Sequence, residues 1–131
     1  MGGVLGVFGS FGERAVAIGT SSTATGTDNI GIGTNVDVGG IRAIVIGREA
    51  ESISVLPNIS TDTITIGTDS TTHGDNTIAF GHNANASHDN SAAIGFNATT
   101  TDTDQIVLGD SNTTTTPVSY THLTLPTILL V

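Results

Sequence analysis

The sequence predicts an all-β protein in which short parallel strands stack as the coils of a solenoid. Three observations support this prediction: the composition, a glycine that returns at every fourteenth position, and the alternation of side chains along short apolar segments. The 131 residues include 17 Gly, 23 Thr and 9 Asn, which favour strands and tight turns. The strong helix formers Lys, Glu, Gln and Met are scarce or absent, and the length suits one modest domain.

An apolar–x–apolar–Gly unit recurs along the chain and defines the period. Its glycines are Gly19, Gly33, Gly47, Gly67, Gly81, Gly95 and Gly109. Five of the six intervals equal that from Gly19 to Gly33, and the interval from Gly47 to Gly67 is six positions longer. Self-similarity at a fixed period is typical of a solenoid. The longer interval predicts an inserted loop at about residues 53–58, where Pro57 would be unfavourable in a ladder of strands.

The first element of each unit is a strand that ends at the repeat glycine. Successive side chains of a strand point to opposite faces. The last residue of each apolar–x–apolar segment, directly before the glycine, should therefore face away from the middle residue. We expect the larger set to fill the coil interior: Ile18, Ile32, Ile46, Ile66, Phe80, Ile94 and Leu108. The middle residues would then form an outer apolar stripe that requires a partner, which predicts self-association through Ala17, Val45, Ala79, Ala93 and Val107.

The second element of each unit is a shorter strand of small residues, three and five positions after the glycine. Its members are Ser22 and Ala24, Val36 and Val38, Ala50 and Ser52, Ser70 and Thr72, Ala84 and Ala86, and Ala98 and Thr100. Both members of each pair should lie on one face. A second turn follows, with Gly26, Gly40, Gly74, His88 and Asp102 at equivalent places. One coil is therefore a strand, a glycine turn, a second strand and a polar or glycine turn.

Charge and composition exclude several classes of function. Twelve acids against three arginines give a net charge of -9, which excludes nucleic-acid binding through phosphate contacts. The absence of cysteine excludes disulfides, thiol catalysis and thiolate zinc sites. No apolar run approaches the roughly 20 residues that span a bilayer, and residues 1–11 lack the basic segment and cleavage site of a signal peptide. We expect no membrane insertion by this chain.

The residues that could suggest catalysis or metal binding are better interpreted as surface turn residues. His82 and His88 are six residues apart, which suits neither a helix face nor a strand pair, and His73 is interpreted in the same way. The acids at turns are Asp28, Asp62, Asp75, Asp89, Asp102 and Asp104, where a carboxylate can hydrogen-bond its own backbone. Calcium-solenoid, EF-hand and G-x-S-x-G motifs are absent from the sequence. We expect no enzymatic activity, no cofactor and no metal site.

A solenoid rich in Thr also raises ice binding as an alternative, because that function needs an unbroken rank of Thr on one flat face. Four residues after each glycine the rank is Thr23, Asp37, Glu51, Thr71, Asn85, Thr99 and Thr113. Six residues after, it is Thr25, Gly39, Ile53, His73, Ser87, Thr101 and Thr115. Acids and a histidine interrupt both ranks, so ice binding is the less favoured function.

The repeat motif itself has a recognisable form. It appears as Ala15-Val-Ala-Ile-Gly19-Thr-Ser-Ser-Thr-Ala24-Thr-Gly26 and again as Ser91-Ala-Ala-Ile-Gly95-Phe-Asn-Ala98. This unit, AxAIGxxAxAxG, resembles the head repeat of trimeric autotransporter adhesins, the YadA-like head. The segment Gln105-Ile-Val-Leu-Gly109 resembles the last head coil of that family and of viral fibres that share it. Over residues 15–111 the resemblance implies a left-handed parallel β-roll with three chains side by side.

The two ends of the sequence differ from the repeats. Residues 1–14 are interpreted as a degenerate first coil or an incomplete N-terminal segment, and residues 15–117 as the repeats. Residues 118–131 break the period and resemble the in-frame translation of a transposase-type sequencing adapter, so we interpret them as foreign to the native protein. Resequencing the locus with a different library chemistry tests this interpretation, which fails if the same codons are found in the genome.

The resemblance implies an adhesive head segment of a trimeric surface fibre that attaches to host cells or extracellular matrix. Its partners would be two further copies of the chain and a host-surface or matrix ligand. Such a fibre would be extracellular, involved in virulence and anchored in an outer membrane through regions beyond this sequence. The alternative is a phage or viral tail-fibre segment that recognises a host from the virion.

Overall fold

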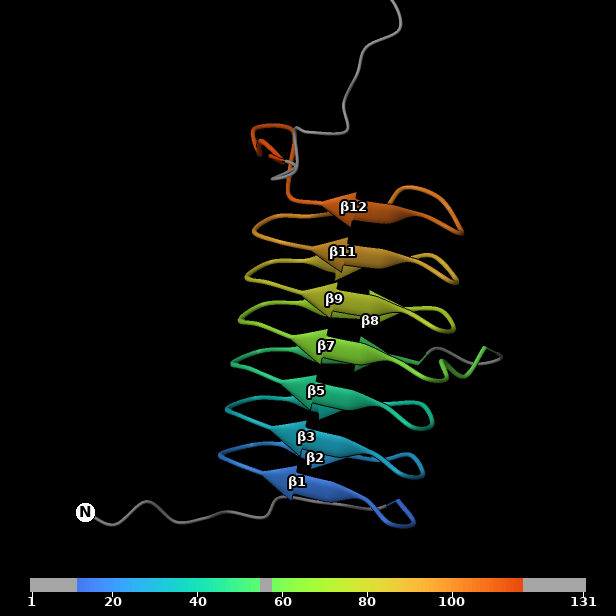
Figure 1. Cartoon of the computed structure of the whole chain (residues 1–131). Coiled ribbons are helices and arrows are strands. Elements are labelled where there is room, and N and C mark those ends of the chain that lie inside the picture. Colours follow the sequence, from blue (N-terminus) through green and yellow to red (C-terminus); the bar gives the residue numbers. More distant parts are fainter. Residues whose placement is uncertain (1–11, 55–57, 117–131) are drawn as a thin grey trace, which may run out of the picture.

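The computed structural model describes residues 12–54 and 58–116, which form one column of stacked coils (Figure 1). The strands of this part of the chain are β1 (Val16–Ile18), β2 (Thr23–Ala24), β3 (Ile30–Ile32), β4 (Asp37–Val38), β5 (Ile44–Ile46), β6 (Glu51–Ile53), β7 (Ile64–Ile66), β8 (Thr71–His73), β9 (Ile78–Phe80), β10 (Asn85–Ala86), β11 (Ala92–Ile94) and β12 (Ile106–Leu108). We number coils 1 to 7 as residues 12–25, 26–39, 40–53, 60–73, 74–87, 88–101 and 102–115.

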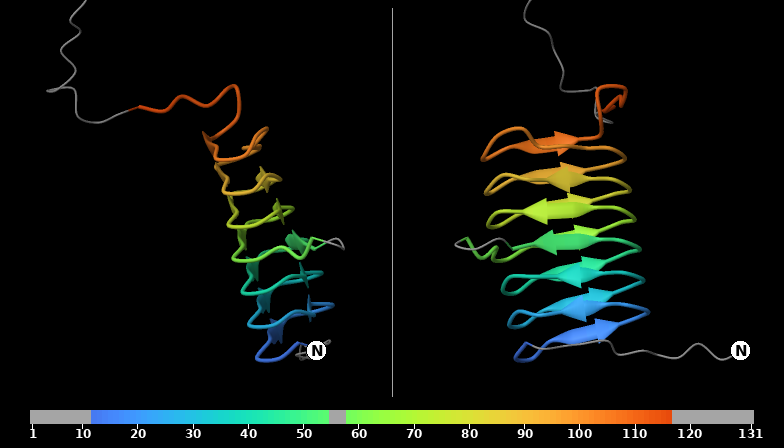
Figure 2. Two further views of the ribbon diagram at one scale, coloured as in Figure 1. Left: turned by 90° about the vertical axis from the view of Figure 1, so that its right-hand side faces the viewer. Right: turned by 180° about the vertical axis from the view of Figure 1, so that it is seen from behind.

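The strands form two parallel sheets that line the two broad sides of the column (Figure 2). One sheet has the order β1-β3-β5-β7-β9-β11-β12, and the other has the order β10-β8-β6-β4-β2. Val16 lies opposite Ile30 in the first sheet, and Ile44 lies opposite Ile64. The register therefore advances by one sequence period per coil, and by one period plus the insertion between β5 and β7. The predicted parallel β-solenoid is confirmed.

The corners between the sheets are built on residues with positive φ. In the described part of the chain the non-glycine residues of this kind are Arg14, Ser21, Asp28, Asn35, Arg42, Glu49, Asp62, Asp69, Asn76, Asn83, Asn90, Asn97 and Asp104. They recur at every seventh position on either side of the insertion, so each complete coil turns twice through a left-handed residue. Asn and Asp dominate the set because their short polar side chains tolerate this conformation.

Small side chains fill the narrow interior between the two sheets. In coil 3 the inward positions are Ala43, Val45, Ala50 and Ser52, which are at most 2% exposed. The small-residue pairs predicted for the second strand all point inward, and each member is at most 2% exposed. The prediction for these pairs is therefore confirmed.

The predicted orientation of the first strand is wrong, because its faces are reversed. Six of the seven expected core residues are between 36% and 52% exposed: Ile18, Ile32, Ile46, Phe80, Ile94 and Leu108. The seventh, Ile66, is half-buried. The residues expected to face a partner lie inside the coil instead: Ala17, Val45, Ala79 and Ala93 are at most 4% exposed, and Val107 in the last coil is half-buried.

The reversal follows from the width of the coil. At Gly31, the middle position of β3, an added Cβ would lie 2.8 Å from Val38 Cγ2 and 3.3 Å from Val36 Cγ1. Two inward valines from the second strand thus leave room for glycine alone on the first. Isoleucine or phenylalanine in every coil would not fit such a space, because interiors are already close-packed. The expectation that larger apolar residues point inward does not hold in so thin a fold.

The described residues on either side of the insertion, 54 and 58–59, lie at one corner of the column (Figures 1 and 2). Ile53 pairs with His73, and Ile41 forms a bridge with Thr61, so the six additional residues are 54–59. Pro57 lies outside the described residues, as do residues 1–11 of the expected N-terminal segment and the whole of residues 118–131.

Candidate functional site

The outer side of the seven-stranded sheet is an apolar surface that runs along the column, and we call it the apolar face. Its exposed members are Val16, Ile18, Ile30, Ile32, Ile46, Ile78, Phe80, Ile94, Ile106 and Leu108. Their exposed fractions range from 36% at Ile30 to 72% at Ile106. Each strand of this sheet has its middle residue toward the coil interior, so both flanking side chains point outward. A continuous apolar surface on this scale is typical of an interaction site.

The outer side of the five-stranded sheet is polar, and we call it the polar face. Stacked positions on it carry Thr23, Asp37, Glu51, Thr71 and Asn85, with Asp37 directly opposite Glu51. The Thr23 hydroxyl donates a hydrogen bond to Asp37 Oδ1 at 2.6 Å. The two carboxylates interrupt the Thr rank in the structure as they do in the sequence.

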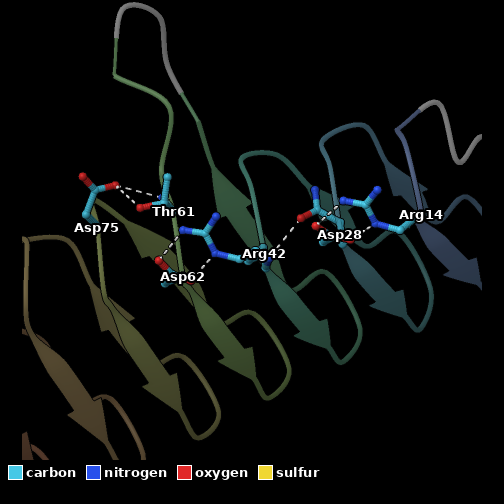
Figure 3. A network of polar contacts seen from close by, with 8 residues as sticks. Arg14, Asp28, Arg42, Thr61, Asp62 and Asp75 are labelled. Carbon is cyan, nitrogen blue, oxygen red and sulfur yellow. Dashed lines mark hydrogen bonds and ion pairs between the residues drawn. The ribbon is translucent and has the colours of Figure 1, made fainter.

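One corner carries a ladder of alternating charge at its positive-φ positions (Figure 3). Arg14 binds Asp28 through two nitrogens, and Arg42 binds Asp62 with Nε–Oδ1 and Nη2–Oδ2 distances of 2.6 Å. Hydrogen bonding from Arg42 holds the pKa of the Asp62 carboxyl below its usual value, and Arg14 lowers the pKa of Asp28 in the same way. Arg14 and Asp28 are separated by one repeat period, and Arg42 and Asp62 by one period plus the six inserted residues. The spacing in the sequence could therefore have indicated the ladder.

The opposite corner is held by an ion pair and by stacked amides. Arg48 Nη2 lies 3.6 Å from Asp69 Oδ2 in the next coil, and Arg48 Nη1 lies 2.8 Å from Glu49 Oε1. Two coils further on, Asn83 Nδ2 donates to Asn97 Oδ1 at 2.8 Å. The Arg48–Asp69 and Asn83–Asn97 contacts join neighbouring coils, and the sequence analysis missed them.

Asp28 and Asp62 pair with arginines, whereas other turn aspartates bind backbone groups, although not always their own. The Thr61 amide donates to Asp75 Oδ1 at 2.8 Å, and the Asp75 amide donates to Asp89 Oδ1 at 2.9 Å (Figure 3 shows the first). Each of these carboxylates therefore fastens its corner to the coil before it. Asp102 keeps the local role that was expected, because its Oδ1 accepts a hydrogen bond from the Thr103 amide.

His73, His82 and His88 belong to coils 4, 5 and 6. His82 Nδ1 is 3.1 Å from the carbonyl oxygen of Thr68, so Nδ1 carries the proton in this contact. Its ring meets Phe96 edge to face, with the centroids 5.5 Å apart. His73 lies in β8, and His88 Nδ1 contacts the hydroxyl of Ser87. Within residues 12–54 and 58–116 no three His, Cys, Asp or Glu side chains gather as a metal site would require.

A hollow of about 380 Å³ lies beside the last strand, lined by Asn97, Thr99, Val107, Leu108, Gly109, Asp110 and Ser111. Its carboxylate, Asp110, accepts hydrogen bonds from the Thr113 hydroxyl and the Asn112 amide, both at 2.9 Å. These bonds lower the pKa of Asp110. The carboxylate therefore stabilises the turn after β12.

The described residues include no helix long and apolar enough to cross a membrane. The features available for recognition are the two broad faces and the corners. Each is a ladder of equivalent residues, one from each coil.

Comparisons with known proteins identify the repeat. The YadA head domain repeat family matches residues 12–35, 61–83 and 73–98. Among solved structures, the collagen-binding domain of the Yersinia adhesin YadA is similar, with 19% sequence identity and a TM-score of 0.45. That match covers 83% of this chain and 73% of the other. No curated protein matches the chain. The repeats of residues 12–35 and 61–98 are thus similar to the YadA head domain repeat.

Proposed function

We propose that this head works as a homotrimer in which the apolar face of each chain packs against the other two. The observation that carries the proposal is the unbroken apolar face, on which residues as large as Phe80 and Leu108 are each 52% exposed. Covering these side chains removes apolar surface from water, which is the main favourable term in protein association. The expectation of a trimer from the sequence is kept, but the contacting residues are the flanking side chains of each strand.

The polar faces of such a trimer point outward and present Thr, Asn and carboxylate side chains to a ligand. The net charge of -9 per chain favours a ligand with basic groups. Each contact is shallow, so affinity comes from repetition along the column and among three chains. We propose attachment to host cells or extracellular matrix from an extracellular, non-enzymatic fibre anchored in an outer membrane. A tail fibre of a phage or virus remains the alternative.

Sedimentation equilibrium tests the assembly. We expect a mass three times that of one chain, which is 13.2 kDa. The double variant Ile32→Asp and Ile46→Asp places two carboxylates on the apolar face and should give monomers. The matched control, Thr23→Asp and Thr71→Asp, adds the same charge to the polar face and should leave the trimer intact. A monomeric wild-type chain would overturn the proposal.

Binding to immobilised collagen, to other matrix proteins and to mammalian cells tests attachment. The trimer should bind at least one of these surfaces, and the monomeric variant should bind far more weakly because valency is lost. Binding to bacterial cells alone would favour the tail fibre instead. Shaping of ice crystals by the purified chain would support the remaining alternative and count against attachment.

A further inference from the structure

The core of the column changes its chemistry at coil 4. One apolar cluster fills coils 1 to 3 and ends at Ala50, and a second fills coils 5 and 6 and begins at Ala79. The inward side chains between the two clusters all carry hydroxyl groups: Ser52, Thr63, Thr65, Ser70, Thr72 and Thr77. Coil 4 thus contributes no apolar side chain to the interior of the described column.

The hydroxyl groups of this layer bond mainly to each other and to nearby carbonyls. Thr65 and Thr72 pair across the coil at 2.7 Å between their oxygens, and Ser52 pairs with Thr63 at 2.9 Å. Thr77 Oγ1 is buried without a partner among the described residues. Paired hydroxyls contribute little net stability, because unfolding exchanges them for water, and an unpaired one is a cost. The layer therefore holds the two apolar clusters together less strongly than either cluster holds itself.

Two further features meet at the same level. The insertion adds six positions to the connection into coil 4, which raises the entropy cost of closing that turn. Ion pairs then bridge coils 3 and 4 at both corners: Arg42 with Asp62, and Arg48 with Asp69. These side chains are between 36% and 55% exposed, so salt screens their attraction.

We propose that coil 4 is a joint, where the column opens locally while the apolar clusters on either side stay folded, and that the two Arg–Asp pairs control how readily it opens. Local opening at coil 4 would allow the elongated column to bend or open without unfolding completely. The proposal concerns a single chain and does not depend on the trimer. Salt loosens the joint, because the pairs at its corners are weakened while the flanking apolar cores are not.

Hydrogen exchange of the full chain, followed by mass spectrometry below the denaturant range of global unfolding, tests the proposal. Amides of β7 and β8 should exchange roughly tenfold faster than those of β3 and β9. About 1 M salt should widen that difference. The double variant Thr65→Val and Thr72→Val replaces one bonded hydroxyl pair by methyl groups and should slow exchange in coil 4 alone. Equal exchange in all four strands of the wild-type chain would overturn the proposal.

Surface variants keep the test available if the double valine variant does not fold. Arg42→Gln and Arg48→Gln together should speed exchange in β7 and β8 and abolish most of its salt dependence. Arg14→Gln is the matched control, because it removes the equivalent pair between coils 1 and 2 and should leave coil 4 unchanged. Faster exchange along the whole column in the first variant, rather than in coil 4, would contradict a local joint.

Discussion

The corners of each coil require particular residues because neighbouring coils touch there through their backbones. Gly33 has a φ of +147° and lies directly against the equivalent glycine of the next coil. An added Cβ would overlap the Gly47 carbonyl group and lie 2.9 Å from Val36 Cγ2. The glycine period therefore reports stacking contacts, which is why it could be identified from the sequence alone.

Replacing Gly33 by alanine should destabilise the column by roughly 2 kcal/mol or more, because strain in φ adds to a backbone clash. Urea unfolding followed by circular dichroism measures this change. Thr34→Ala, one residue along and exposed, is the control and should change stability by less than about 0.5 kcal/mol. Equal stability of the two variants would show that the corner adapts to a side chain.

The charged corner predicts a pH dependence. Arg42 lowers the pKa of Asp62 in the folded chain, so the pair stabilises the fold above the unfolded pKa of about 3.9. That contribution disappears as the pH falls through the lower pKa of the folded state. We expect Arg42→Gln to have a lower Tm than the wild-type chain at pH 7, and the two values to converge at acidic pH. A constant difference across the acid range would contradict the assignment.

Single strands show which structural features the sequence could not predict. Alternation correctly separated Ala93 from Ile94, and the period correctly stacked each on its equivalents. Which of the two residues points inward depends on the distance between the sheets. The sequence of the first strand alone does not indicate that distance. The small pairs on the second strand could have indicated it, since Ala84 and Ala86 are matched by Ala79 rather than by Phe80 in a narrow coil.

Ala93→Leu tests the observed orientation. Ala93 is fully buried, so added methyl groups have no room and should cost about 1–3 kcal/mol or more. Ile94→Leu preserves volume on the outer face and should leave the stability of the single chain nearly unchanged. Chemical denaturation of both variants measures the difference. The opposite order of stabilities would restore the orientation expected from side-chain size.

Contacts between neighbouring coils stabilise the column within one chain. Packing of other chains against the apolar face would add to this stability. The sequence predicted the number of coils, the parallel stacking of their strands and the position of the insertion, because these follow from the spacing of the repeats. It did not predict the polar layer in coil 4, because that layer depends on which strand face points inward. The Arg42–Asp62 pair follows from the repeat spacing but was not predicted, and Arg48–Asp69 joins positions that are not equivalent in the repeat.

If the apolar face is covered by two other copies, the Tm should rise with chain concentration. Calorimetry across a wide range of dilutions measures this, and the Ile32→Asp and Ile46→Asp variant should lose the dependence. A Tm independent of concentration in the wild-type chain would mean that the exposed isoleucines are tolerated in a stable monomer.

The positive-φ corner residues recur twice in each coil, at intervals of half a coil. This spacing constrains how the gene can change in length. Duplicating the codons for one full coil adds one coil to the column, and each residue of the new coil still stacks on its equivalents in the neighbouring coils. Losing half a coil would preserve the corners but exchange the isoleucine-bearing side with the threonine-bearing side from that level onward. Viable length variants should therefore differ by complete coils, or carry their additional codons as a loop outside the stack, as the insertion before coil 4 does.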